Sequence, residues 1–275
     1  MFSLHACLPG SNNTRYVVPA IYAILCDKSQ QSYTELLTAI NNIPGYTFNP
    51  LSVMTDFEQG LQNSFQSVFP TIDTSGCLFH YNQALLRKVN EIGMKAAYEH
   101  RPINTATGLR GPSETKIHIR RAANLAFVPI PDIPTAWDEI AAQFPVTPEF
   151  DRFVTYFERT WVGNRRSNPL YALNKWNVRE RCLNDLLTTN NNVEGFHNAF
   201  SDLVGHRNPT VWTWLDAVKA SQNLSFNALI RQAGDLPAPP SNKLVLSRQR
   251  RLKGVLRNYG TTSLIEYLDM CNIAM

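Results

Sequence analysis

The chain has 275 residues, of which 44% are hydrophobic and 11% aromatic, so it has enough apolar side chains for a full core and is not a disordered tail. Its 26 basic and 22 acidic residues give a net charge of +4, which permits a polyanionic partner without requiring one. The longest apolar run, Val17 to Leu25, contains Pro19 and is far shorter than the about 18 residues of a membrane span. No secretory signal pattern opens the chain. We therefore expect an intracellular globular protein with no membrane partner.

Strand and helix patterns alternate in the first third of the chain. Segments rich in β-branched, aromatic and aliphatic residues predict short strands at residues 2–6, 16–26, 51–55 and 77–79, the first two joined as a hairpin. Apolar residues spaced by three and four predict helices after the second, third and fourth strands. Ser29 or Ser32 caps the first of these helices, which ends at Pro44-Gly45. This alternation is typical of an α/β fold.

Beyond Gly93 the pattern becomes helical. Residues 96–189 contain helical stripes among loops rich in Pro, Asn and Trp, with no convincing strand, and we interpret them as an all-helical insertion. An amphipathic helix capped by Asn190 or Asn191 follows, and a second helix is expected over Val211–Gln232. A stiff linker, Pro237–Pro240, then leads to the C-terminal segment.

Five side chains are candidates for chemistry, and each has a structural alternative. Asp56 ends a predicted strand, where open α/β sheets place ligands, but it would equally cap the next helix. Cys77 and His80 are metal-ligand types, yet zinc needs four ligands, and a buried thiol beside a helix-start histidine explains them as well. Glu194 and His197 share one helix face and suit a metal, although a solvated glutamate stabilised by the helix dipole is the plainer interpretation.

The C-terminal segment has the strongest charge asymmetry of the chain. Residues 236–265 contain no acidic side chain and six basic ones, which are Lys243, Arg248, Arg250, Arg251, Lys253 and Arg257. A local excess of this kind is what contacts with DNA phosphates require, because each neutralised phosphate releases counterions. A solvated helix face is the alternative.

Taken in order, these segments resemble the Mutator-like element (MULE) transposase domain of the ribonuclease H-like superfamily, from Phe2 to about Trp214. The matching motifs are Tyr22-Ala-Ile-Leu25 with Tyr33 downstream, Thr55-Asp56-Phe57-Glu58, Gly76-Cys77-Leu78-Phe79-His80-Tyr81, Leu125-Ala-Phe-Val-Pro129, Tyr156-Phe157-Glu158 with Trp161, Trp176-Asn177, and Asn190-Asn191-Asn192-Val193-Glu194-Gly195-Phe196-His197.

The resemblance implies an α/β, ribonuclease H-like sheet interrupted by a helical insertion. Its core would comprise residues 1–95 and 190–235, with the insertion at 96–189 and a basic C-terminal segment at 236–275. Asp56 and Glu194 would be the second and third carboxylates of a catalytic triad that holds two Mg²⁺ or Mn²⁺ ions for DNA cleavage and strand transfer. Cys77, His80 and His197 would organise that site. A DNA partner and a nuclear location follow from the same resemblance, and a homo-oligomer stays open.

One departure from the family bears on activity. The first catalytic Asp of the family lies on an opening strand directly before the segment that matches Phe2–Ala6, and residues 1–275 do not contain it. We therefore expect a truncated sheet with two exposed strand edges, marginal stability and no cleavage by this chain alone. The chain would be a fragment of a transposase, or alternatively a domesticated, non-catalytic module that binds DNA or protein. A helical interaction scaffold without a nucleic-acid role is the third hypothesis.

Overall fold

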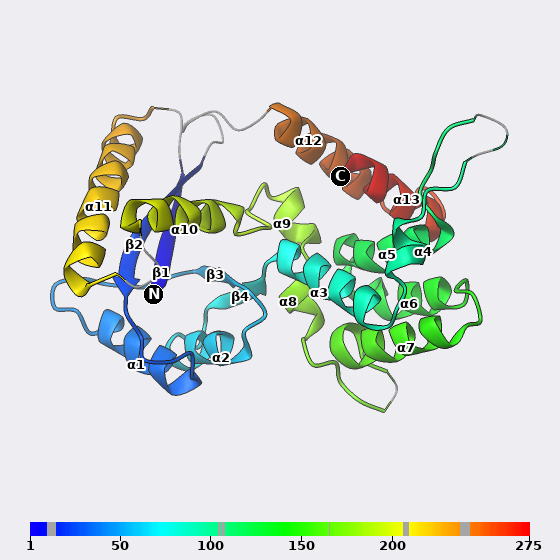
Figure 1. The fold of residues 1–275 in the computed structure, drawn as a ribbon, viewed down its shortest axis with the longest axis horizontal. Coiled ribbons are helices and arrows are strands. Elements are labelled where there is room, and N and C mark those ends of the chain that lie inside the picture. The colour runs from blue at the N-terminus through cyan, green and yellow to red at the C-terminus, as the bar shows by residue number, and fades with distance from the viewer. Residues whose placement is uncertain (10–14, 104, 106–107, 165, 206–208, 237–242) are drawn as a thin grey trace. The chain divides into compact units, whose positions relative to one another are not determined.

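The computed structural model describes residues 1–9, 15–103, 105, 108–164, 166–205, 209–236 and 243–275 (Figure 1). The predicted linker Pro237–Pro240 lies outside the described residues. The chain forms two compact units, each assembled from distant segments. Unit 1 contains Met1–Asn49, Gln59–Pro70 and Thr189–Asn242, and unit 2 contains Pro50–Glu58, Thr71–Thr188 and Lys243–Met275. Among the described residues, no helix combines the length and the apolar character that crossing a membrane demands.

Unit 1 is built on the predicted hairpin. Strand β1 (Phe2–Pro9) pairs antiparallel with β2 (Arg15–Ala23), from Phe2 opposite Ala23 to Pro9 opposite Arg15. The register shifts between Leu4 and His5, which marks a bulge in β1. The hairpin prediction is confirmed.

In the described residues of unit 1, four helices accompany the hairpin, and each corresponds to a predicted helix. They are α1 (Gln30–Asn41), α2 (Gln59–Val68), α10 (Asn191–Val204) and α11 (Val211–Ala233). The Ser29 side chain accepts the Ser32 N–H at 3.1 Å, so Ser29 is the cap of α1. Figure 1 shows α10 and α11 beside the hairpin. The ring of Tyr22 on β2 lies 6.0 Å from that of Phe200 on α10, and its hydroxyl lies 2.8 Å from Ser221 Oγ on α11.

The second sheet belongs to unit 2 and is a parallel pair. Strand β3 (Ser52–Thr55) confirms the strand predicted at 51–55, and it pairs with β4 (Asp73–Gly76). The strand predicted at Cys77–Phe79 is wrong, because Cys77 occupies the cap position of helix α3 (Leu78–Glu91). Asp, Thr, Ser and Gly make up β4, and the weak strand propensity of Asp and Gly concealed it. The segment forms a strand in spite of this low propensity because it pairs in parallel with β3, which supplies its backbone hydrogen bonds.

Helices form the rest of unit 2. The α-helices are α4 (Lys95–Glu99), α5 (Glu114–Ala123), α6 (Ile133–Ala141), α7 (Pro148–Phe157), α8 (Leu173–Trp176), α9 (Arg179–Leu183), α12 (Lys243–Arg257) and α13 (Leu264–Ala274). The described residues also contain short 3₁₀ helices (Asn124–Phe127, Ile130–Asp132) and a π-helical turn (Glu158–Val162) between them. No named strand occurs in the described part of residues 96–189, as the sequence pattern predicts.

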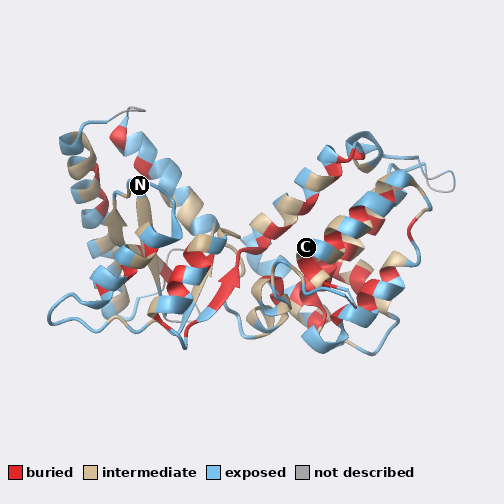
Figure 2. Ribbon diagram, turned by 90° about the horizontal axis from the view of Figure 1, so that it is seen from below, coloured by how far each residue is buried: buried red, intermediate tan, exposed pale blue. Residues whose placement is uncertain are grey.

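The core of unit 2 is aromatic and continuous. Tyr81 stacks on Trp176 with an interplanar angle of 6° and meets Trp161 edge-on, and all three side chains are buried. Leu252, Leu256, Leu268 and Cys271 enter the same cluster from α12 and α13. Figure 2, coloured by burial, shows buried residues in red on many of the helices. The C-terminal helices are therefore part of the fold of unit 2.

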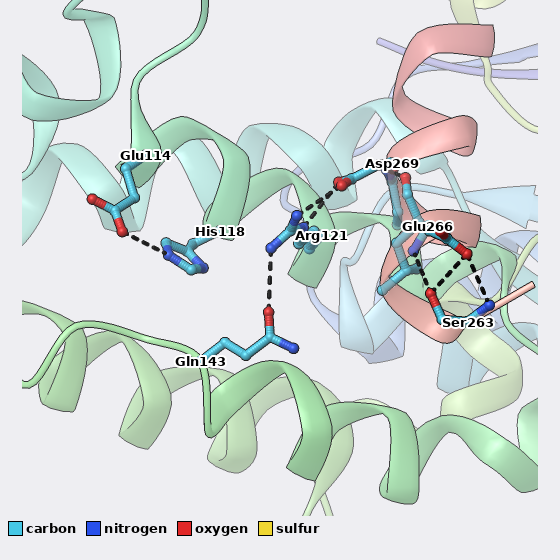
Figure 3. Close-up of polar contacts among 9 residues, drawn as sticks. Glu114, His118, Arg121, Gln143, Ser263, Glu266 and Asp269 are labelled. Carbon is cyan, nitrogen blue, oxygen red and sulfur yellow. Dashed lines mark hydrogen bonds and ion pairs between the residues drawn. The ribbon is translucent and has the colours of Figure 1, made fainter.

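An ion pair fastens α13 to α5. Arg121 donates through Nε and one terminal nitrogen to the two carboxylate oxygens of Asp269, at 2.9 and 2.7 Å, and through the other to Gln143 (Figure 3). At the start of α13, Ser263 and Glu266 form a reciprocal capping box. The described residues thus form an α/β protein that is mostly helical, with one antiparallel and one parallel pair of strands. The ribonuclease H-like arrangement stays a prediction.

Candidate functional site

Asp56 stands where the sequence predicts it, directly after β3. The strand ends at Thr55, whose hydroxyl donates to the Asp56 carbonyl oxygen at 2.7 Å and whose own carbonyl accepts the Cys77 N–H at 2.8 Å. Helix α2 begins only at Gln59, so Asp56 does not occupy the position next to the helix that a cap would take. Its half-buried side chain lies at the C-terminal end of a parallel pair of strands, the end at which α/β sheets bind ligands.

Aromatic packing fixes the backbone on either side of Asp56. The ring of Phe57 makes edge contacts with Trp161 and Tyr171, each at 5.0 Å between centroids. The Tyr171 hydroxyl donates to the Phe57 carbonyl at 2.9 Å. Burial raises the pKa of Tyr171, and the negative charge of Asp56 raises it further, so a neutral phenol accompanies the carboxylate. The Asp56 backbone is thus held by packing against the unit 2 core.

Cys77 and His80 lie just after the C-terminal end of β4, at the start of α3. Cys77 is fully buried at the cap position, and His80 is half-buried one turn into the helix with its ring 5.5 Å from that of Phe79. Unit 2 therefore contains Asp56, Cys77 and His80 around the ends of β3 and β4. No group of three or more His, Cys, Asp or Glu suited to a metal ion occurs in the residues that the structure describes.

Glu194 and His197 belong to unit 1, on α10. Glu194 lies in the first turn of the helix, where its N–H donates to the Asn190 carbonyl at 3.1 Å. A carboxylate in this position is favoured by the helix dipole. Its oxygens, like those of Asp56, are donors of the kind that Mg²⁺ and Mn²⁺ prefer, so the chemistry of both side chains fits such ions.

His197 takes part in a contact that links α10 to β1. Its Nε2 lies 2.8 Å from Ser3 Oγ, and the same oxygen lies 3.0 Å from His5 Nε2. Burial lowers the pKa of His5 to about 4, helped by the neighbouring His197, and burial also lowers the pKa of His197. Both imidazoles are therefore neutral at pH 7. The rings of His5 and Phe196 also meet edge to face, with 4.7 Å between their centroids.

Sequence reasoning missed Ser3 and His5 as members of this cluster. The sequence did contain one signal for them. Ser3 and His5 are polar residues two positions apart in a predicted strand, and such positions share one face of the strand. Their partner His197 is 194 residues away from Ser3, and no local pattern indicates that contact.

The six basic residues of the C-terminal segment all lie on α12. Lys253 is ion-paired with Asp185, on the loop after α9. The other five side chains are exposed, and no ion pair engages them within the described part of the chain, namely Lys243, Arg248, Arg250, Arg251 and Arg257.

Comparison with known families gives a match over the first third of the chain. Residues 3–84 match the family model described as MULE transposase domain. The matched range runs from β1 into α3 and includes Asp56, Cys77 and His80. No curated protein and no solved structure matches the chain.

Proposed function

We propose that the chain, whose residues 3–84 match the MULE transposase domain model, is part of a transposase of that family and acts on DNA. The observation that carries the proposal is the position of Asp56, inside the matched range and at the C-terminal end of the β3–β4 pair. A polar carboxylate at that point has a clear use in the family activity, which is DNA cleavage and strand transfer. The same activity implies a nuclear location, and a homo-oligomer stays open.

The proposed roles follow from the chemistry of the side chains. Asp56 and Glu194 would each offer carboxylate oxygens to divalent ions, Mg²⁺ or Mn²⁺. Two such ions, when bound, activate the attacking water or 3′-hydroxyl and stabilise the leaving oxygen of an in-line displacement. Cys77, His80 and His197 would organise the surrounding backbone. For His197 the contact with Ser3 supports this role, because it fixes α10 one turn after Glu194.

We further propose that residues 1–275 by themselves do not cleave DNA. The resemblance assigns two of the three family carboxylates to these residues, Asp56 and Glu194. The test is nicking of supercoiled plasmid by the purified chain in Mn²⁺, with conversion to the open circle measured on a gel. We expect no conversion above that of the buffer. Nicking that Asp56→Ala and Glu194→Ala each abolish would overturn the proposal.

The transcript offers a second test of the same point. Mapping its 5′ end and translating upstream of Met1 shows whether an in-frame, strand-like segment ending in Asp precedes Phe2. If it does, the longer chain is expected to nick DNA in Mn²⁺ and to lose that activity with Asp56→Ala. A longer chain with that segment and no nicking would contradict the assignment of Asp56 and Glu194.

A non-catalytic DNA- or protein-binding module is the second candidate function. The observation that favours it is the set of exposed, unpaired cations on α12 in the described part of the chain. Salt-dependent DNA binding that survives Asp56→Ala but fails when Arg248, Arg250 and Arg251 are neutralised would support this function over catalysis. Binding that instead requires Asp56 and a divalent ion would favour the catalytic assignment.

A further inference from the structure

One side of α12 carries regularly spaced cations separated by small residues. Lys243, Arg250 and Arg257 recur every seven residues, and Ser247 and Gly254 lie between them. At about 100° per residue these five positions fall within about 80° of one another around the helix axis. We call them the α12 stripe. Leu252 and Leu256, which are buried in the unit 2 core, lie on the opposite side of the helix.

The N-terminal half of α12 is not covered by the rest of unit 2. Every residue from Lys243 to Arg251 is exposed. Val245 shares the side of the helix on which Leu252 is buried, yet 44% of its surface is exposed. This half of the helix therefore extends beyond the core, and its stripe is accessible to a large partner.

Gly254 has no role in the packing of unit 2. A Cβ added there would meet no other atom within 4 Å, and the residue is not at positive φ. Glycine inside a helix costs about 1 kcal/mol relative to alanine. Its presence between Arg250 and Arg257 is explained if another molecule must approach the helix backbone at this point.

The other cations of α12 are placed differently. Lys253 is ion-paired with Asp185 and is partly withdrawn from solvent. Arg248 and Arg251 point about 140° and 80° away from the centre of the α12 stripe. Of the six basic residues of the segment, three thus belong to the α12 stripe, Arg248 and Arg251 lie outside it and are called the flanking pair, and Lys253 is already ion-paired.

We propose that the α12 stripe binds the backbone phosphates of duplex DNA, with Ser247 and Gly254 allowing close contact between the helix and the phosphates. Seven residues of helix rise about 10.5 Å, so the three cations span about 21 Å. Phosphates follow each other by about 3.4 Å of axis per strand, and the major groove is about 12 Å wide. Successive cations of the stripe therefore reach phosphates on one strand or on both sides of a groove. The choice of DNA as the partner rests on the proposed function. The assignment of DNA binding to the α12 stripe does not follow from that function and rests on the positions of the cations.

The test compares two double variants of the full chain that remove the same charge from the same helix. Arg250→Gln/Arg257→Gln alters the stripe, and Arg248→Gln/Arg251→Gln alters the flanking pair. Binding to a labelled DNA duplex is measured by fluorescence anisotropy between 50 and 200 mM salt. Each lost phosphate contact lowers the slope of log K against log salt by about 0.9, so we expect a loss of about 1.8 for the stripe pair and well under 1 for the flanking pair.

A third variant tests close approach without changing charge. Gly254→Gln places a neutral side chain between Arg250 and Arg257 at an exposed helical position, where it favours the helix. We expect weaker DNA binding at every salt concentration with an unchanged thermal midpoint or a higher one. Gly111→Gln is the matched control, because a Cβ there also meets no atom within 4 Å.

The possible results separate this inference from the proposed function. Equal slope losses for the two double variants, or a larger loss for the flanking pair, would overturn the stripe and leave DNA binding in place. If the unaltered chain binds no duplex at any salt concentration tested, both the stripe and the DNA-binding part of the proposed function are wrong.

Discussion

The ring of Phe57 lies directly over Gly76, so close that a Cβ at position 76 would overlap it. Both residues lie at the C-terminal ends of the parallel strands beside Asp56. Phe57 comes two residues after the end of β3, and Gly76 is the last residue of β4. Glycine at this position is therefore what allows the aromatic packing beside Asp56 and the pairing of β3 with β4 to coexist.

Gly76→Ala is expected to destabilise unit 2. The added methyl group must displace a ring that also contacts Trp161 and Tyr171, and overpacking of this kind costs roughly 1–3 kcal/mol. Urea unfolding followed by tryptophan fluorescence measures the change. A midpoint equal to that of the unaltered chain would show that Phe57 moves aside without cost, and would remove the packing argument for the position of Asp56.

Gly254→Ala gives the opposite expectation within the same unit. The methyl group meets no atom within 4 Å, and alanine is favoured over glycine in a helix by about 1 kcal/mol. The urea midpoint of unit 2 should therefore rise. A fall would mean that position 254 has a packing role that the structure does not contain, and would remove one of the observations behind the α12 stripe.

Periodicity predicted much of this fold, and tertiary contacts account for what it missed. The strand before Asp56 and the helices around Tyr33, Phe196 and Trp214 were found because apolar residues recur at the spacing of each element. Strand β4 was missed because its polar and small residues lack that signal. The assembly of each unit from separate chain segments has no local signature at all.

For the candidate site, too, the sequence predicted local positions and missed a contact between distant residues. Asp56 was placed correctly at the end of a strand because the strand itself is strongly patterned. The bridge from Ser3 to His197 joins two segments of unit 1 that are far apart in the sequence, and it depends on how α10 packs on β1. Such a contact arises from the tertiary fold. The sequence alone therefore does not predict that Ser3 and His197 are in contact.

His118 makes the stability of unit 2 depend on pH. Burial lowers the pKa of this imidazole, and Arg121 lowers it further, while Glu114 and Asp269 act in the opposite direction (Figure 3). A lowered pKa in the folded state means that the unfolded chain binds more protons. The contribution of His118 is therefore complete above its ordinary pKa of 6.5 and is lost progressively as the pH falls below that value.

Urea unfolding at pH 7.5 and 5.5 tests this assignment. The unaltered chain should lose stability at the lower pH, and His118→Leu should lose less, because leucine cannot be protonated and suits a position between Phe144 and Phe150. Other groups that titrate in this range contribute equally to both proteins and cancel in the comparison. An identical loss in the variant would show that His118 is not responsible.

Ser3→Ala tests the contact that holds α10 on β1. The hydroxyl of Ser3 bridges two neutral imidazoles, because its oxygen lies within hydrogen-bond distance of the Nε2 atoms of both His5 and His197. Removing the hydroxyl eliminates both hydrogen bonds, at a cost of about 1 kcal/mol for each bond that solvent does not replace. We expect unit 1 to lose stability and the imidazole nitrogen NMR signals of His5 and His197 to shift together. Ser201→Ala is the control, since Ser201 is exposed and its hydroxyl donates to the His197 carbonyl within α10. Shifts of equal size in both variants would mean that Ser3 does not bridge the two rings, and would withdraw the positioning role proposed for His197.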